Sequence, residues 1–313
     1  MKKLLIACLM FAGMQTVSAQ EATWVPKNLA VGVGVGTTGI VIDASTTIHN
    51  YFGVRFGVDI FPKIKINKDI DLKTETANKQ LSQLTGEINE LNTQLVAAGL
   101  PAVDLSQYPD GNLPNKMAVQ GKWSNTTWHF LIDVYPFGAA HSFHATVGAY
   151  FGSSEIVTLY NREDGFLSPI NSYNEAYLYS RSAAADPSVR NVIDKYGLSM
   201  IGAEMGDYFV TPSPAEQGNF KAYAKVNSFR PYLGVGFGRA VPKNRIGCQF
   251  DLGVQFWGKP DVYAPIYDKL IGEYRYEKID GDRAGNDAGK VLKTISKISV
   301  YPVLNFRLVG RIL

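Results

Sequence analysis

The chain has 313 residues, of which 46% are hydrophobic and 19% charged, and its formal net charge is +3. A balance so close to neutral gives no support for nucleic-acid binding. After the N-terminal segment no run of 18 or more apolar residues occurs, so the sequence predicts no membrane-spanning helix.

Residues 1–19 have the features of a secretory signal peptide. Lys2 and Lys3 precede an apolar run, which ends in the small-residue cleavage site Val17-Ser18-Ala19. We expect cleavage after Ala19, which leaves residues 20–313 as the mature chain. Cys248 is then the only cysteine, so an internal disulfide and a cysteine-based metal site are excluded. We expect no metal and no cofactor.

Eight stretches of the mature chain alternate between apolar residues and small or polar ones. One face of each stretch is apolar, while the other carries glycine, aspartate, arginine or glutamine, which is the inverse of a soluble barrel. Lipid cannot hydrogen-bond an open sheet edge, so strands that cross a membrane must close into a barrel. The pattern predicts an all-β fold, an eight-stranded antiparallel up-and-down transmembrane β-barrel, with strands at about 29–36, 39–46, 52–62, 127–136, 143–152, 230–240, 247–257 and 298–313.

The connections between these strands differ in length according to the side on which they fall. Three are long, at about 63–126, 153–229 and 258–297, and all three lie on the same side of an eight-stranded barrel. Outer-membrane barrels have short periplasmic turns and long outer loops, so we expect these three to be extracellular. A ten-stranded barrel would need Tyr208–Thr211 and Phe220–Val226 as a membrane hairpin, but these runs are short or charged.

The first long loop contains a heptad pattern, which predicts a helix over about Thr74–Ala98. Its apolar stripe has two interpretations: it packs on neighbouring loops, or it binds a partner protein or a second copy of the chain. The residues of this stripe are Leu81, Leu84, Ile88, Leu91 and Leu95. The other long loops suggest a short helix at Pro187–Tyr196 and a hairpin extended above the membrane by Glu273–Glu277.

The phase of the strands places four aspartates and four arginines inside the barrel. Charges on the lipid face would cost about 2–4 kcal/mol at the midplane, so their one-sided placement supports this phase. An eight-stranded barrel is just wide enough for side chains to fill, so we expect a balanced lumen charge network that plugs it. Its predicted members are Asp43, Arg55, Asp59, Asp133, Arg230, Asp251, Arg307 and Arg311.

Aromatic residues gather near the ends of the predicted strands, as they do at membrane interfaces. Near the outer ends these are Trp128, Phe151, Phe229, Trp257 and Tyr301. We therefore expect two aromatic belts on the outside of the barrel.

Ser142 and His144 are the one pair that suggests catalysis, of the kind used by lipid-modifying enzymes of the outer membrane. They lie at a predicted periplasmic turn, and no third residue is spaced to orient them. We expect no enzymatic activity.

Several strand motifs resemble a family of small bacterial outer-membrane β-barrel proteins of the Bacteroidetes type. The motifs are Asn50–Val58, Asp133–Phe137, Val147–Phe151, Pro231–Gly238 and Asp251–Pro260. The resemblance covers about a third of the chain and implies a location and a fold but no reaction. The chain ends in Ile312-Leu313 and departs from the terminal aromatic residue common in substrates of the barrel-assembly machinery.

From these features we expect a scaffold or surface interaction protein of the outer membrane, acting through its long loops. Its expected partners are outer-membrane lipid and the barrel-assembly machinery. Two alternatives are a narrow or gated conduit for small solutes or apolar molecules and, less favoured, a lipid-modifying enzyme.

Overall fold

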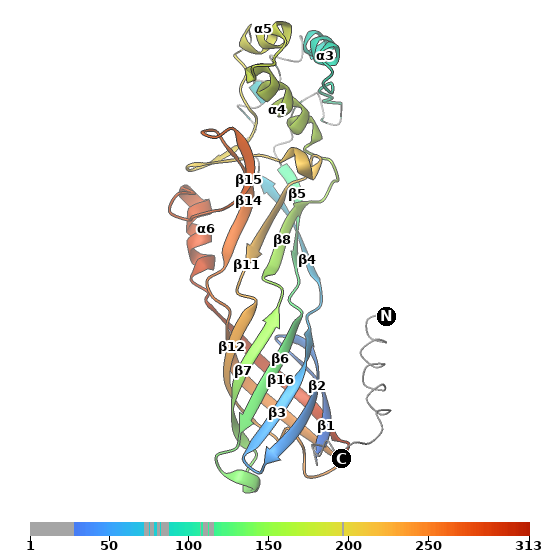
Figure 1. Cartoon of the computed structure of the whole chain (residues 1–313), viewed down its shortest axis with the longest axis vertical. Coiled ribbons are helices and arrows are strands. Elements are labelled where there is room, and N and C mark those ends of the chain that lie inside the picture. Colours follow the sequence, from blue (N-terminus) through green and yellow to red (C-terminus); the bar gives the residue numbers. More distant parts are fainter. Residues whose placement is uncertain are drawn as a thin grey trace, which may run out of the picture.

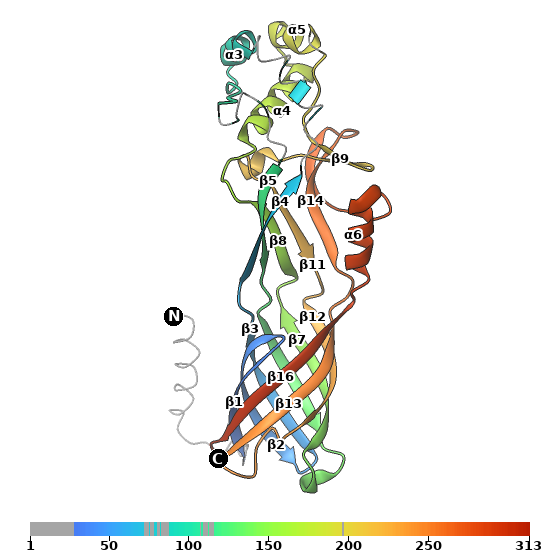
Figure 2. The same ribbon diagram turned by 180° about the vertical axis from the view of Figure 1, so that it is seen from behind.

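The structure is a computed structural model, and it describes residues 28–71, 75, 78–79, 82, 88–106, 108, 112, 116–195 and 197–313. The predicted signal peptide lies outside the described residues. The molecule is a column with a closed barrel at one end, a second sheet in the middle and a cap of helices at the other end (Figures 1 and 2).

The barrel is a meander: each of its strands pairs antiparallel with the barrel strands that come before and after it along the chain. The first and last strands pair with each other from Ala30–Arg311 to Gly36–Asn305, and this closes the sheet. The predicted eight-stranded antiparallel barrel is confirmed, with strand ends within three residues of those expected. The strands are β1 (Leu29–Gly36), β2 (Gly39–His49), β3 (Phe52–Ile60), β6 (Thr127–Val134), β7 (Phe143–Gly152), β12 (Phe229–Phe237), β13 (Ile246–Phe256) and β16 (Val300–Arg311).

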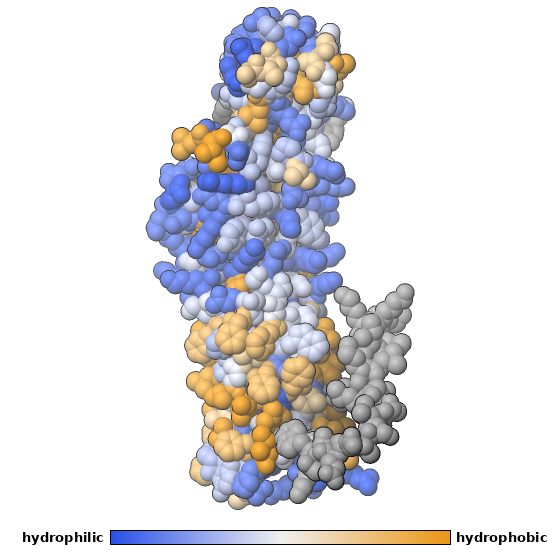
Figure 3. Space-filling model, in the orientation of Figure 1, coloured by the Kyte–Doolittle hydropathy of each residue, from blue (hydrophilic) through white to orange (hydrophobic). Residues whose placement is uncertain are grey.

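The outside of the barrel is apolar because the alternation of each strand turns its large apolar side chains outward. Figure 3 shows them as a belt that covers the barrel and ends where the second sheet begins. The exposed members include Val33, Val35, Ile40, Phe56, Trp128, Phe130, Val147, Phe151, Phe229, Leu233, Val235, Phe237, Phe250, Leu252, Phe256, Leu304, Phe306 and Leu308.

The three long connections build a second sheet, where the sequence predicted loops with a helix over about Thr74–Ala98, a short helix at Pro187–Tyr196 and a hairpin extension at Glu273–Glu277. Five barrel strands continue into it after breaks of two to four residues, and the neighbour order of the barrel is kept. The sequence pattern missed these strands because they carry lysines and other polar side chains and do not read as lipid-facing. They are β4 (Ile64–Asp71), β5 (Lys116–Trp123), β8 (Glu155–Asn161), β11 (Lys221–Lys225) and β14 (Asp261–Asp268).

Shorter strands complete the second sheet. These are β9 (Ala203–Met205), β10 (Tyr208–Val210) and β15 (Glu273–Lys278), where β15 is the predicted extension of a hairpin. The runs considered for a ten-stranded barrel therefore pair in the second sheet and not in the barrel. Two 3-10 helices, Gly138–Ala140 and Pro214–Glu216, lie in connections.

The cap consists of α3 (Ile88–Ala97), α4 (Ser168–Arg181) and α5 (Pro187–Lys195), and α6 (Asn286–Ser296) lies beside β14 (Figures 1 and 2). Leu91 and Leu95 of α3 are fully buried in a core that they share with α4 and α5. These two side chains are thus covered by the same chain, and Leu81 and Leu84 lie outside the described residues. Among the helices that the structure describes, none has the length and hydrophobicity of a membrane span.

The buried side chain of Asn174 connects α4 to the chain that follows α5. Its amide accepts a hydrogen bond from the Ile201 N–H at 2.8 Å and donates to the Ile201 carbonyl at 2.8 Å and to Thr211 Oγ1 at 3.0 Å.

Asn174→Ala should destabilise the cap by about 1–3 kcal/mol, because buried backbone groups then lose their partners. Hydrogen exchange should show faster exchange in α4 and α5 but not in the barrel. The exposed substitution Asn89→Ala is the control; equal protection in both variants would contradict the prediction.

Candidate functional site

The lumen of the barrel is filled by polar and charged side chains that bond to one another. Their exposed fractions are between 0% and 4%, so a water-sized probe does not reach them. They come from β2, β3, β6, β7, β13 and β16, because the alternation turns these residues inward. They are Asp43, Arg55, Asp59, His129, Asp133, His144, Thr146, Gln249, Asp251, Asn305 and Arg307.

Arg55 is the centre of this network and contacts two carboxylates. Its Nη1 donates to Asp251 Oδ2 at 2.8 Å, and its Nη2 donates to Asp133 Oδ1 at 2.7 Å. Thr146 Oγ1 donates to the same Asp133 oxygen at 2.8 Å. Since β3 and β13 lie four strands apart in a ring of eight, the contact between Arg55 and Asp251 spans the diameter of the barrel.

Arg307 forms a second centre, beside the glycine-rich strand β1. It donates through Nη2 to Asp43 Oδ1 and through Nη1 to Gln249 Oε1, the latter at 2.7 Å. A Cβ at Gly32 would lie 2.6 Å from Arg307 Nη2 and 2.7 Å from Asp43 Oδ1. The small residues of β1 therefore leave the space that the guanidinium occupies, as their alternation with valine suggests.

Two histidines of the lumen each bond to a carboxylate. His129 Nδ1 lies 2.6 Å from Asp59 Oδ2, and His144 Nε2 lies 2.9 Å from Asp251 Oδ1. Among the described residues, Asp133, His144 and Asp251 bring potential metal ligands within 4.8 Å of one another. The Arg55 guanidinium already bonds to both of these aspartates and takes the place of a cation there.

Apolar side chains also fill part of the lumen. Leu131, Tyr150, Tyr232 and Val303 pack together, and Leu131 lies between the network members His129 and Asp133 on β6. At the end of the barrel away from the second sheet Val241, in the turn between β12 and β13, packs against Ala30 and Val309.

Arg239 holds the turn between β12 and β13 in place. Its guanidinium lies 4.5 Å from the centre of the Tyr135 ring and donates to the carbonyls of Gly138, His141 and Asn50. This turn is thus tied to two neighbouring turns, and it covers the mouth of the barrel. Nothing in the sequence indicated this role beyond the shortness of the connection.

Two of the eight residues predicted for the network do not belong to it. Arg230 is buried at the edge of the second sheet, where it donates to the carbonyls of Asn227 and Ser153 and to Asn125 Oδ1. Arg311 is exposed at the opposite end and donates to Asn28 Oδ1 and the Leu313 carbonyl. Strand phase fixes the face on which a residue lies but not its bonding partner, and these arginines lie at strand ends.

The charges of the lumen therefore do not balance in the predicted way. Four buried aspartates face two buried arginines and two histidines, where four arginines were expected. Asp43, Asp59, Asp133 and Asp251 occupy the predicted positions, as do Arg55 and Arg307. His129 and His144 belong to the network in addition to the predicted residues.

Ser142 and His144 do not form a catalytic pair. The His144 Nδ1 faces the backbone carbonyl of Ser142 at 3.3 Å, and the imidazole is fully buried in the lumen.

The predicted outer aromatic belt also needs a correction. Trp128 is exposed on the outside, but Trp257 is buried and donates to the Ile298 carbonyl, while Tyr301 packs against it.

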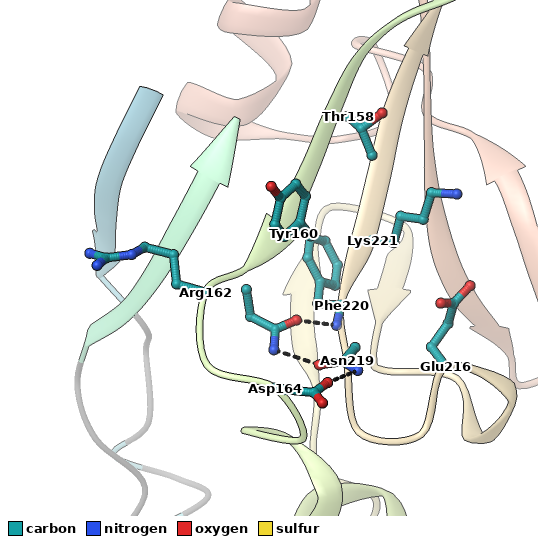
Figure 4. A pocket seen from close by; sticks show the side chains of 9 residues that line it. Thr158, Tyr160, Arg162, Asp164, Glu216, Asn219, Phe220 and Lys221 are labelled. Carbon is teal, nitrogen blue, oxygen red and sulfur yellow. Dashed lines mark hydrogen bonds between the residues drawn. The ribbon is translucent and has the colours of Figure 1, made fainter. Parts of the chain in front are cut away.

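The second sheet carries a separate open cavity of about 430 Å³ between β8 and β11 (Figure 4). It is lined by Tyr160 and Phe220 together with charged and amide side chains, among them Asn219, which donates to Asp164 Oδ1 at 2.8 Å. Nearby, burial and a hydrogen bond to Glu216 raise the pKa of Tyr276. Among the described residues, no bonded cluster comparable to the lumen network lines this cavity.

Comparison with known proteins gives distant structural matches. Acinetobacter baumannii CarO matches with a TM-score of 0.40 and 13% identity over 93% of this chain and 99% of that chain. Acinetobacter baumannii CarO2 has a TM-score of 0.38 and 12% identity, and a major outer membrane protein from Thermus thermophilus has 0.34 and 10%; each covers 91% of this chain and 98% of its own.

These neighbours are bacterial outer-membrane β-barrel proteins, and they do not single out the Bacteroidetes-type family that the strand motifs resemble. At these TM-scores the likeness carries no argument about function. No family model matches the chain, and no curated protein matches it.

Arg55→Gln should destabilise the barrel by about 3–5 kcal/mol, because it leaves Asp133 and Asp251 buried without their cation. Arg311→Gln removes a charge of the same type that is exposed, so its effect should stay within about 0.5 kcal/mol. Urea unfolding of the protein folded in lipid vesicles, followed by tryptophan fluorescence, measures both. Similar midpoints for the two variants would show that the lumen network does not stabilise the barrel.

Proposed function

We propose that the protein is an integral outer-membrane barrel with a closed lumen, which anchors the second sheet and the helical cap at the cell surface as an interaction scaffold. The observation that carries the proposal is the combination of an apolar outer surface with a lumen filled by side chains. The first favours insertion into lipid and the second argues against a wide aqueous pore.

The apolar belt supports a membrane location on energetic grounds. A monomeric soluble protein rarely exposes a contiguous apolar patch of more than a few hundred Å², and here all eight barrel strands carry exposed large apolar side chains. The barrel strands are 8–12 residues long, which suits tilted strands in the hydrocarbon layer. The predicted signal peptide supplies the route of export.

The scaffold role is supported by the size and direction of the part outside the belt. The second sheet and the cap extend from the same end of the barrel, while the turns after β2, β6 and β12 and the C-terminus lie at the other (Figure 1). Outer-membrane barrels place their long connections outward, so this part would face the exterior.

A narrow conduit is the second candidate, and one observation favours it. Six buried polar atoms of the lumen have no hydrogen-bond partner within the described part of the protein: Asp43 Oδ2, Arg55 Nε, His129 Nε2, Arg307 Nε and both amide atoms of Gln255. Such atoms normally bond to water. Water at these positions would give the lumen a polar path that small motions of the apolar side chains packed beside it could open.

Insertion can be tested through the exposed tryptophan of β6. Trp128 lies on the outside of the barrel with 53% of its surface exposed. Its fluorescence should be quenched strongly by brominated phospholipid when the protein is folded in vesicles, since the ring then touches the lipid chains. In a background that carries Trp24→Phe and Trp123→Phe, Trp128→Phe should remove most of the quenching, because the remaining Trp257 is buried. Equal quenching in the presence and absence of Trp128 would contradict insertion in this orientation.

Closure of the lumen can be tested by single-channel recording of the refolded mature protein in a planar bilayer. We expect no conductance steps of nanosiemens size. The double variant Arg55→Ala/Asp251→Ala removes the central contact without changing the net charge of the lumen, and we expect it to give small steps. Large steps from the unchanged protein would overturn the closed lumen, and small regular steps would favour the conduit.

A further inference from the structure

We propose a binding site for the phosphate of a membrane lipid headgroup at the rim of the barrel, between α6 and the link from β13 to β14. This inference rests on the proposed membrane location and adds a specific ligand to it. The site is a pocket of about 480 Å³ lined by Lys259, Lys293, Lys297, Ser296, Ser299 and Asp282.

The lining of this pocket is positively charged. Its one acid, Asp282, is bonded to Lys293 at 2.6 Å. Lys259 and Lys297 are exposed and have no ion-pair partner among the described residues. Two lysines with free ammonium groups, next to the hydroxyls of two serines, provide the donors that a phosphate oxygen accepts.

The two free lysines are held at a fixed separation although they lie far apart in the sequence. Trp257 Nε1 donates to the Ile298 carbonyl at 2.8 Å, and its ring packs on Tyr301 with 5.0 Å between ring centres. Lys259 follows Trp257 by two residues, and Lys297 and Ser299 flank Ile298. This contact therefore positions the pocket before any ligand arrives, which lowers the entropic cost of binding.

The position of the pocket selects a lipid over a free phosphate. Directly below it, β13 and β16 pair outward-facing apolar residues in a continuous ladder. The pairs are Phe256–Val300, Val254–Pro302, Leu252–Leu304 and Phe250–Phe306. Acyl chains lying on this ladder would place their phosphorylated headgroup at the level of Lys259 and Lys297. Basic pockets at membrane interfaces bind lipid headgroups in this way.

The test uses the refolded mature protein in phosphatidylcholine nanodiscs doped with a diphosphorylated glycolipid or its dephosphorylated form. Native mass spectrometry then measures how much glycolipid stays bound. The double variant Lys259→Gln/Lys297→Gln removes both free charges. The matched control is Lys63→Gln/Lys65→Gln, which removes two exposed lysines, one in the link from β3 to β4 and one at the start of β4; β3 lies four strands from β13 around the ring.

We expect the unchanged protein and the control variant to retain the phosphorylated glycolipid. Retention should fall about twenty-fivefold in Lys259→Gln/Lys297→Gln, because each lysine near a membrane surface contributes roughly a fivefold change. The dephosphorylated lipid should be retained weakly by all three proteins.

Three results would overturn the proposal: equal losses in the two double variants, equal retention of the dephosphorylated lipid, or lysine-dependent binding of inorganic phosphate in detergent without any retention of lipid. Insertion is scored first in the same nanodiscs by the quenching of Trp128. A protein that fails to insert contradicts the proposed function, whereas a protein that inserts but retains no lipid contradicts this inference alone.

Discussion

The structure depends on burying ionised side chains in a space from which water is excluded. A barrel of eight strands has room inside for side chains and little else. Each aspartate placed there needs a partner, because an isolated buried charge costs far more than the net stability of a protein. Arg55 bonds to Asp133 on the neighbouring strand β6 and to Asp251 on β13 across the barrel, so one guanidinium satisfies two carboxylates. The rest of the lumen is arranged around this contact and its counterpart at Arg307.

This constraint also explains where the glycines lie. Positions opposite a long inward side chain have no space for a Cβ, as at Gly32 beside Arg307 and at Gly236, where a Cβ would lie 2.6 Å from His144 Nε2. The two faces of each strand meet different requirements. The outer face must be apolar because it contacts lipid in the proposed location, and the inner face must be filled by side chains that do not overlap.

The part of the chain beyond the apolar belt obeys a different rule. The strands β4, β5, β8, β11 and β14 continue the hydrogen-bond ladder of the barrel but are free of the demand for an apolar outer face. They alternate less regularly, and lysines and tyrosines appear on them. For this reason they escaped prediction, although the chain passes from barrel to second sheet with breaks of only a few residues. At the rim, which is the boundary between the barrel and the second sheet, α6 and Trp257 lie close to Lys259 and Lys297.

The sequence by itself determined the number of barrel strands, their approximate ends and the face on which most of their residues lie. These follow from alternation along one strand, which is local and needs no knowledge of other strands. Alternation correctly placed Asp43, Arg55, Asp59, Asp133, Asp251 and Arg307 in the lumen. It also placed Arg230 on the inner face, where this side chain is buried but bonds outside the network.

Only the tertiary structure decided which charges meet. The alternation of a strand shows which face a residue lies on, but not its position along the barrel axis or the residue that it faces across the lumen. Arg230 and Arg311 lie at strand ends and bond to neutral groups, so the expected balance of four aspartates and four arginines is absent. Trp257 was expected in an outer belt but turns inward at the end of β13, and Leu91 and Leu95 are covered by helices that follow them by more than 70 residues. Contacts between residues so distant in the chain depend on how the strands and helices pack, which no local pattern specifies.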